Sequence, residues 1–238
     1  MIIEGFTDRA FVTGILKRLG CVSLGASGQP PPLDPWKAKV TGGQHAWESS
    51  TGAFIRVVAA NNDDLEKRVR VFAATAATTP TEILLVVPDS DQNPGDAPLP
   101  ELQRRLNEMK KFFTGVADVG PRAFSSTEIG HVAAGVWSEQ EPGADLPATQ
   151  TLERMVSASF RSVHPARFSE VTNFLTSRTA APLPTGKEQA MALMAGWYSD
   201  RYSESFFEAV WEDAAIATDL ERRLRATGTY EAFERIAA

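Results

Sequence analysis

Carboxylates gather at two points of this sequence, each directly after a run of apolar residues. Glu4 and Asp8 follow the apolar start of the chain, and Asp89 and Asp91 follow the apolar run 83–87. Carboxylate oxygens are the ligands that Mg²⁺ and Mn²⁺ take in sites that handle phosphate. Like charges brought together are costly unless a cation neutralises them or they retain protons. The residue types therefore predict a site for Mg²⁺ or Mn²⁺ that performs chemistry on phosphate groups.

Two strands have to bring these carboxylates together. Residues 1–3 and 83–87 are apolar throughout, which is typical of strands buried on both faces of a parallel sheet. Strand and helix patterns alternate through the first half of the chain, which predicts right-handed crossovers. Sites in open α/β sheets form where loops from neighbouring strands meet, at the carboxyl edge. We therefore expect Glu4 and the pair Asp89 and Asp91 at one edge of the sheet.

The other elements are predicted from the period of the apolar residues and from turn residues. Further strands are expected at 54–60 and 129–136, with a brief extended piece at 21–24. Helices are expected at 8–19, 65–76, 101–113, 166–176, 187–199, 203–214 and 218–227. The segment 25–52 is rich in Gly and Pro and too long for an ordinary connection, so we interpret it as an insertion. The sequence thus predicts an α/β domain over residues 1–150, with an all-helical C-terminal region over residues 151–238 packed on it.

Composition restricts the classes of function. The net charge of -6 and the pI of about 5.2 disfavour a protein that coats nucleic acid non-specifically, because such proteins need a broad basic surface. They are compatible with an enzyme that handles nucleic acid through a metal ion and a small basic patch. Cys21, the single cysteine, permits no internal disulfide. No apolar run is long enough to span a bilayer and no signal peptide is visible. We therefore expect a cytoplasmic protein with no membrane partner.

Two motifs resemble those of the Toprim domain. The stretch 1–11, MIIEGFTDRAF, is similar to its first motif, and the stretch 84–91, LLVVPDSD, is similar to its D-x-D motif. This domain is shared by topoisomerases, bacterial primases, small maturation ribonucleases and nucleases of the overcoming-lysogenization-defect type. The resemblance covers about residues 1–115. It implies a compact Rossmann-like parallel sheet flanked by helices, with a divalent-metal site that acts on phosphodiesters.

The same resemblance implies roles for individual residues. Glu4 would be the catalytic residue that transfers a proton or assists the metal. Asp89 and Asp91 would hold the metal, and Asp8 would lie beside them. Two of these positions also have a simpler interpretation: Glu4 as an exposed turn residue, and Asp8 as an acidic residue that the helix dipole stabilises in the first turn of a helix.

A narrower similarity extends to small stand-alone Toprim-like proteins of the DUF3226 type. It is carried by Gly135-Val136-Trp137, Pro142-Gly143 and Thr151-Leu152-Glu153. It nominates Glu153 as a further acidic residue near the metal, although a solvated helix residue is the alternative. Related chains often carry Gly-Gly or Gly-Lys after the second strand, where this chain has Ala-Asn-Asn at 60–62, so no phosphate role is assigned to that loop.

Basic side chains that could contact a phosphate backbone follow the D-x-D motif. Arg104 and Arg105 lie on the next expected helix and are candidate substrate-binding residues, although such residues usually form a solvated helix face. Lys187 is a weaker candidate. The stretch 184–187, PTGK, lacks the upstream glycine and the following Ser or Thr of a P-loop, so opening a helix is the simpler role.

The leading hypothesis is a Mg²⁺- or Mn²⁺-dependent nuclease of Toprim type, a hydrolase that cuts phosphodiesters in DNA or RNA. The alternative is a non-catalytic or partner-dependent Toprim module that binds metal and nucleotide or nucleic acid. Such a module would work with a protein partner or a second copy of the chain, for example in a defence assembly. A positive strip beside the acidic residues would favour the enzyme, and an apolar patch would favour the module.

Overall fold

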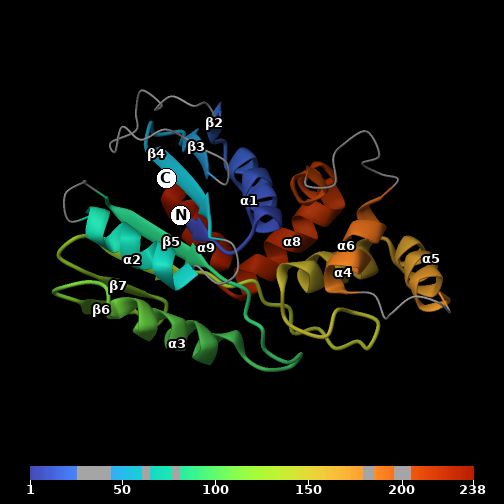
Figure 1. Cartoon of the computed structure of the whole chain (residues 1–238). Helices are drawn as coiled ribbons and strands as arrows, with labels where there is room; N and C mark the ends of the chain where they lie inside the picture. The colour runs from blue at the N-terminus through green and yellow to red at the C-terminus, as the bar shows by residue number, and fades with distance from the viewer. Residues whose placement is uncertain (26–43, 61–64, 77–80, 179–184, 196–204) are drawn as a thin grey trace.

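A mixed sheet of eight strands forms the centre of the molecule (Figure 1). The computed structural model describes residues 1–25, 44–60, 65–76, 81–178, 185–195 and 205–238. Within these ranges the strands are β1 (Ile2–Ile3), β2 (Val22–Gly25), β3 (Gln44–Glu48), β4 (Phe54–Ala59), β5 (Ile83–Val87), β6 (Ala117–Gly120), β7 (Ala123–Ser125) and β8 (His131–Ala134). The helices are α1 (Phe6–Arg18), α2 (Leu65–Ala76), α3 (Pro98–Lys110), α4 (Leu152–Val163), α5 (Pro165–Thr176), α6 (Gly186–Met194), α7 (Phe206–Ala209), the 3₁₀ turn η3 (Val210–Glu212), α8 (Ala214–Ala226) and α9 (Thr229–Ala237).

The strands follow the order β2-β3-β4-β1-β5-β8-β7-β6 across the sheet. The four central strands, β4, β1, β5 and β8, run parallel, and the strands on either side are antiparallel. Ile3 pairs with Ala59 on one side and with Val87 on the other, so β1, β4 and β5 end at the same level. The predicted meeting of the first strand and the 83–87 strand is therefore confirmed.

Side chains of the central strands alternate between two hydrophobic cores. Ile3 and Leu85 face the core formed with α1 and the C-terminal helices, and Ile2 and Val86 face the core formed with α2 and α3. Figure 1 shows α2 and α3 on the near face of the sheet and α1 on the far face. Both faces of β5 are covered, which explains why the run 83–87 is apolar throughout.

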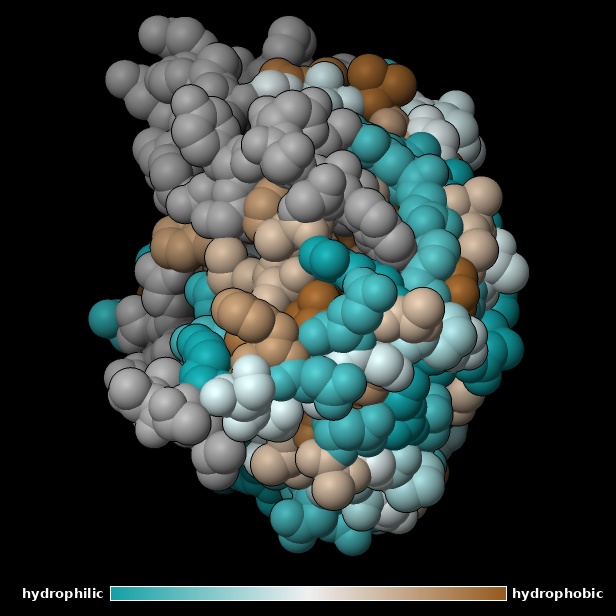
Figure 2. All heavy atoms as spheres, turned by 90° about the vertical axis from the view of Figure 1, so that its right-hand side faces the viewer, coloured by the Kyte–Doolittle hydropathy of each residue, from teal (hydrophilic) through white to brown (hydrophobic). Residues whose placement is uncertain are grey.

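The C-terminal helices continue the core of the α1 face. Met155, Val156 and Phe160 of α4 are fully buried and belong to the same core as Phe11 of α1. Helices α4–α6 lie beyond the end of the sheet (Figure 1), and on this side apolar residues form small groups among hydrophilic ones (Figure 2). No helix of the described residues combines the length and the apolar character that a membrane crossing requires.

Some elements differ from those expected. The segment interpreted as an insertion, 25–52, contains strand β3, while residues 26–43 lie outside the described ranges. The expected helix 203–214 is divided between α7 and the turn η3, and the end of the expected helix 187–199 falls on residues that are not described. Strands β6 and β7 and helices α4 and α9 were not expected. The residues of β6 are all exposed, so that strand carries no apolar period from which it could be recognised.

Candidate metal centre at the carboxyl edge of the sheet

Glu4 and Asp89 are in direct contact where β1 and β5 end. The backbone N–H of Asp89 donates to Oε2 of Glu4 at 2.9 Å. Both residues follow strands that pair in parallel, with Ile3 opposite Val87, so each comes one or two residues past the same level of the sheet. The contact joins residues far apart in the chain and follows from the strand order.

Asp8 joins this group from the first turn of α1. Its Oδ2 accepts a hydrogen bond from the backbone N–H of Gly5 at 3.1 Å, so the simpler interpretation as a residue at the helix start describes one of its oxygens. A Cβ atom on Gly5 would lie 2.9 Å from that Oδ2, so the close approach requires glycine. The other oxygen, Oδ1, is buried and makes no well-formed hydrogen bond with a described residue, although the Trp137 indole lies close enough to lower the pKa of this carboxyl. The position of Asp8 at the helix start therefore explains the contact of Oδ2 but not the burial of Oδ1.

Helix α4 adds Glu153 to the group. The N–H of Leu152, the first residue of α4, donates to Oδ1 of Asp89 at 2.9 Å, which brings the start of the helix to the sheet edge. Glu153 follows directly and is half-buried. Its charge raises the pKa of Glu4, Asp8 and Asp89, so it lies within electrostatic range of all three.

These carboxylates disfavour one another's charge. Burial, followed by the charges of Glu153 and Glu4, raises the pKa of Asp8 to about 7. Burial and the charges of Asp8, Glu153 and Glu4 hold the pKa of Asp89 well above its usual range. Burial also raises the pKa of Glu4. The hydrogen bond from the Asp89 N–H lowers this pKa, and the charge of Asp91 raises it. Full ionisation of the group at neutral pH is therefore unfavourable without a cation.

Asp91 lies at the exposed rim of the group. Its φ of 55° makes it the one non-glycine residue with a left-handed backbone among the described residues. Aspartate tolerates this conformation better than most side chains, and such strain is concentrated at functional sites. Its N–H donates to the carbonyl of Gln150 at 3.1 Å, and its Oδ2 lies 4.0 Å from Nη2 of Arg105.

The three basic candidates have different positions. Arg105 approaches Asp91 while its Nε binds Glu101 at 2.8 Å, and its charge lowers the pKa of Glu4. Arg104 is engaged along α3 by Glu101 and Glu108. Lys187 lies in the first turn of α6 and lines a cleft together with Glu153.

The donor chemistry of this group fits a hard divalent cation. Every candidate ligand atom is a carboxylate oxygen, the type that Mg²⁺ and Mn²⁺ prefer, and Oδ1 of Asp8 is buried without a well-formed hydrogen bond to a described residue. In their present positions, however, no three His, Cys, Asp or Glu side chains of the described residues converge closely enough to hold a metal ion. Glu4 and Asp89 each give one oxygen to a backbone N–H, so their remaining oxygens would have to turn toward the ion.

The residues that hold the D-x-D loop lie far from it in the sequence and were not predicted. The N–H of Ser90 donates to the carbonyl of Trp137, and the N–H of Trp137 donates to the carbonyl of Pro88, both at 3.0 Å. Gln150 binds the loop from the other side, donating its N–H to the carbonyl of Gln92 at 3.0 Å. In the sequence, the one indication of these contacts was the apolar segment Gly135-Val136-Trp137, which precedes an acidic loop.

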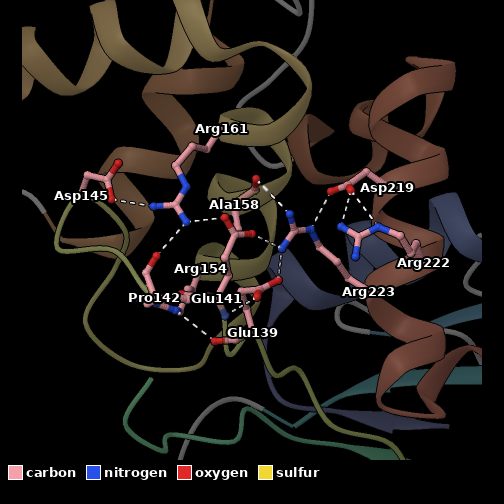
Figure 3. Close-up of polar contacts among 10 residues, drawn as sticks. All are labelled: Glu139, Glu141, Pro142, Asp145, Arg154, Ala158, Arg161, Asp219, Arg222 and Arg223. Carbon is pink, nitrogen blue, oxygen red and sulfur yellow. Dashed lines mark hydrogen bonds and ion pairs between the residues drawn. The ribbon is translucent and has the colours of Figure 1, made fainter. Parts of the chain in front are cut away.

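That acidic loop, residues 138–151, is fastened by three arginines (Figure 3). Arg154 and Arg161 of α4 bind carbonyl and carboxylate oxygens of the loop, and Arg223 of α8 binds Glu139 and Glu141. Arg154 is fully buried, and its guanidinium donates only to main-chain carbonyls of the loop among the described residues. The loop, whose Gln150 carbonyl accepts from Asp91 and which leads into Leu152, the partner of Asp89, is thus tied to two helices.

Comparison with known proteins identifies the fold and no activity. No family model matches the sequence, and no curated protein matches it. Among solved structures, the crystal structure of the hypothetical protein PH0156 from Pyrococcus horikoshii OT3 matches with a TM-score of 0.68 at 15% identity, covering 100% of this chain and 98% of that chain. At this identity the likeness shows a common fold alone. The chain is an α/β protein with a mixed eight-stranded sheet, flanking helices and further helices at its C-terminus.

Proposed function

We propose that this chain is a Mg²⁺- or Mn²⁺-dependent phosphodiesterase of Toprim type that cuts DNA or RNA. The observation that carries the proposal is the grouping of Glu4, Asp8, Asp89 and Glu153, which come from four separate elements and lie close enough to raise one another's pKa. A protein does not ordinarily bury like charges together without a function for them, because each raises the energy of the others. Perturbed pKa values of this kind are common at catalytic and metal sites.

The residues have distinct parts in the proposed reaction. Asp89 and Asp91, with Asp8 beside them, would hold the metal, which when bound lowers the pKa of a water and neutralises charge on the phosphate. Glu4 is suited to move a proton, because burial raises its pKa above that of an exposed glutamate. Arg105, which already lies at the rim beside Asp91, would orient a phosphate of the substrate.

One observation favours the second candidate, a Toprim module that binds metal and nucleic acid without cutting it. The carboxylates do not converge on an ion position in the described residues, and Arg105 is shared with Glu101. Such a site would need a partner, or a second copy of the chain, to complete it. The two candidates differ in turnover, not in the identity of the metal-binding residues.

A nuclease assay separates them. Plasmid, linear duplex and single-stranded substrates are incubated with the full chain and Mg²⁺ or Mn²⁺, and metal binding is measured in parallel by calorimetry. We expect Glu4→Gln and Asp89→Asn to lower the cutting rate by about 10²–10⁴-fold, and Glu66→Gln, which removes an exposed carboxylate on α2, to leave it unchanged. Cutting that survives both site substitutions would refute the proposed site. Metal binding without cutting would favour the module.

A further inference from the structure

An exposed aromatic ring lies beside the carboxylates of the proposed metal centre. Phe6 is the first residue of α1, two residues after Glu4 and two before Asp8, and it is 47% exposed. Because consecutive Cα atoms are about 3.8 Å apart, its Cα atom lies within about 8 Å of those of both acidic residues. A single exposed apolar side chain is ordinary, so the ring becomes informative through the charge that lies over it.

Arg9, one turn further along α1, provides that charge. Its guanidinium carbon is 5.1 Å from the centroid of the Phe6 ring, and it pairs with no carboxylate of the described residues. Burial, followed by the charge of Arg9, lowers the pKa of His45 on β3, whereas the charge of Glu208 raises it. Glu208 is itself bound by Lys17. The charge of Arg9 is therefore half-buried and not neutralised by a described residue, which an anion bound there would relieve.

The two arginines beside the metal centre differ in their availability to a phosphate. An acidic centre repels a phosphate backbone, so a strand needs cations beside it as well as the metal ion. Arg105 approaches Asp91 and is bound by Glu101, so a phosphate there competes with two carboxylates. Arg9 has no such competitor among the described residues. Basic groups that hold phosphates, with aromatic rings on which bases stack, are the combination by which proteins bind single strands.

We propose that Phe6 and Arg9 bind an unpaired nucleotide of single-stranded DNA or RNA, with its base stacked on the Phe6 ring and the adjacent phosphate at Arg9. Arg9 covers part of the ring, and the exposed remainder of Phe6 is the surface available to a base. Bases inside a duplex are already stacked and paired, so this contact selects single strands. The inference deepens the proposed function and rests on it, because the strand would continue from Phe6 past Glu4 to the metal.

Fluorescence anisotropy on the full chain measures this binding without turnover. Labelled single strands of DNA and RNA, and the matching duplexes, are titrated in Mg²⁺ with a parent chain that carries Glu4→Gln, so that the strands stay intact. We expect one of the single strands to bind about 10-fold more tightly than its duplex. Phe6→Ala in this parent should weaken that binding about 5-fold or more, and Phe6→Tyr should restore it. A strand that lacks its bases should bind equally to the parent and to Phe6→Ala.

Phe174→Ala is the matched control for the ring. Phe174 is the other exposed aromatic side chain of the described residues, 66% exposed, and it lies on α5, away from the sheet edge and α1 (Figure 1). Its removal should leave strand binding unchanged. Circular dichroism and thermal unfolding establish that each variant is folded.

The salt dependence of binding tests the phosphate contact. Arg9→Ala removes one such contact, so the slope of log K against log salt concentration should become less steep by about 0.7. Arg18→Ala is the control, because it removes the same charge from the last turn of the same helix, where Arg18 is paired with Glu221. Its slope should equal that of the parent.

The inference is overturned if no single strand binds, if Phe6→Ala weakens binding no more than Phe174→Ala, or if the slopes of Arg9→Ala and Arg18→Ala are equal. The comparison of DNA with RNA identifies the sugar of the strand. Strand binding through Phe6 and Arg9 by a wild-type chain that cuts nothing would refute the proposed function alone. Cutting of single strands at an unchanged rate in both Phe6→Ala and Arg9→Ala would refute this inference alone.

Discussion

Replacement of Arg223 by methionine removes the guanidinium with the most hydrogen-bond partners among the three that hold the loop 138–151. This guanidinium is almost fully buried in α8 and binds Asp219 at 2.6 Å, Glu141 at 2.9 Å, Glu139, and the carbonyl of Ala158 at 3.2 Å (Figure 3). Methionine has a similar stem and fills much of the same volume, so the substitution removes charge more than packing. The change in the free energy of unfolding therefore measures the contribution of the ion pairs and hydrogen bonds of Arg223.

The expected cost follows from which carboxylate loses its partner. Asp219 keeps Arg222 and Glu141 keeps Arg161, but the carboxylate of Glu139 is only 7% exposed and has no other basic partner among the described residues. Breaking a buried pair in this way costs about 3–5 kcal/mol. At about 2–4 °C per kcal/mol for a chain of this size, the unfolding midpoint should fall by about 6–20 °C.

Arg222→Met is the matched control. Arg222 is the neighbouring residue and binds the same Asp219 at 2.5 Å, but its side chain is 64% exposed, so we expect at most about 1 kcal/mol. Urea unfolding followed by circular dichroism measures both variants. The double variant Arg223→Met with Glu139→Gln should recover part of the loss, because it neutralises the orphaned carboxylate. The reasoning is refuted if Arg223→Met costs no more than Arg222→Met, or if the double variant loses the sum of its single losses.

Two further substitutions test other parts of the structure. Burial raises the pKa of Asp8 to about 7, so the folded state retains a proton that the unfolded state loses at lower pH, and this difference lowers stability as the pH rises from about 5 to about 7. Asp8→Asn removes this loss, so in EDTA the variant should gain up to about 3 kcal/mol on the wild type over that interval; parallel pH profiles from urea unfolding would contradict this. Gly14→Ala places a Cβ atom 2.1 Å from Cδ1 of Trp211 and 3.0 Å from the carbonyl of Glu208, so we expect a loss of at least about 1–3 kcal/mol in thermal unfolding. An unchanged midpoint would show that Trp211 moves aside at little cost.

The parallel core of the sheet could be predicted from the sequence because its signals are local. An uninterrupted apolar run such as 83–87 indicates a strand covered on both faces, and β5 has those bounds in the structure. Helical crossovers give these strands one direction, so Glu4 and Asp89 could be expected at the same edge of the sheet. Their direct contact depends on the pairing of β1 with β5, which the crossovers do not determine. The pairing of Asp8 with Gly5 was also open to prediction, since an acidic residue in a first turn has a known structural role.

Helix α4 could not be predicted, because its polar residues are buried. Arg154, Ser157 and Ser159 interrupt the apolar period of the helix, yet all three are fully buried in the structure. Arg154 is buried because loop carbonyls accept its hydrogen bonds, and those carbonyls lie outside the helix. A local pattern carries no information about such distant partners, so Glu153 was assigned to the site from a resemblance and not from its helix.

The buried arginines are better explained by geometry than by stability. Burying a charged pair gives little net stability over an apolar pair of similar size, because desolvation offsets the attraction. Charged pairs do fix one arrangement, since each hydrogen bond requires a particular direction. The loop that Arg154 and Arg223 hold contains Gln150, whose carbonyl accepts from Asp91, and it leads into Leu152 of α4, whose N–H donates to Asp89. If these arginines position the D-x-D motif, Arg223→Met should weaken metal binding even at temperatures where the variant is fully folded, whereas Arg222→Met should not.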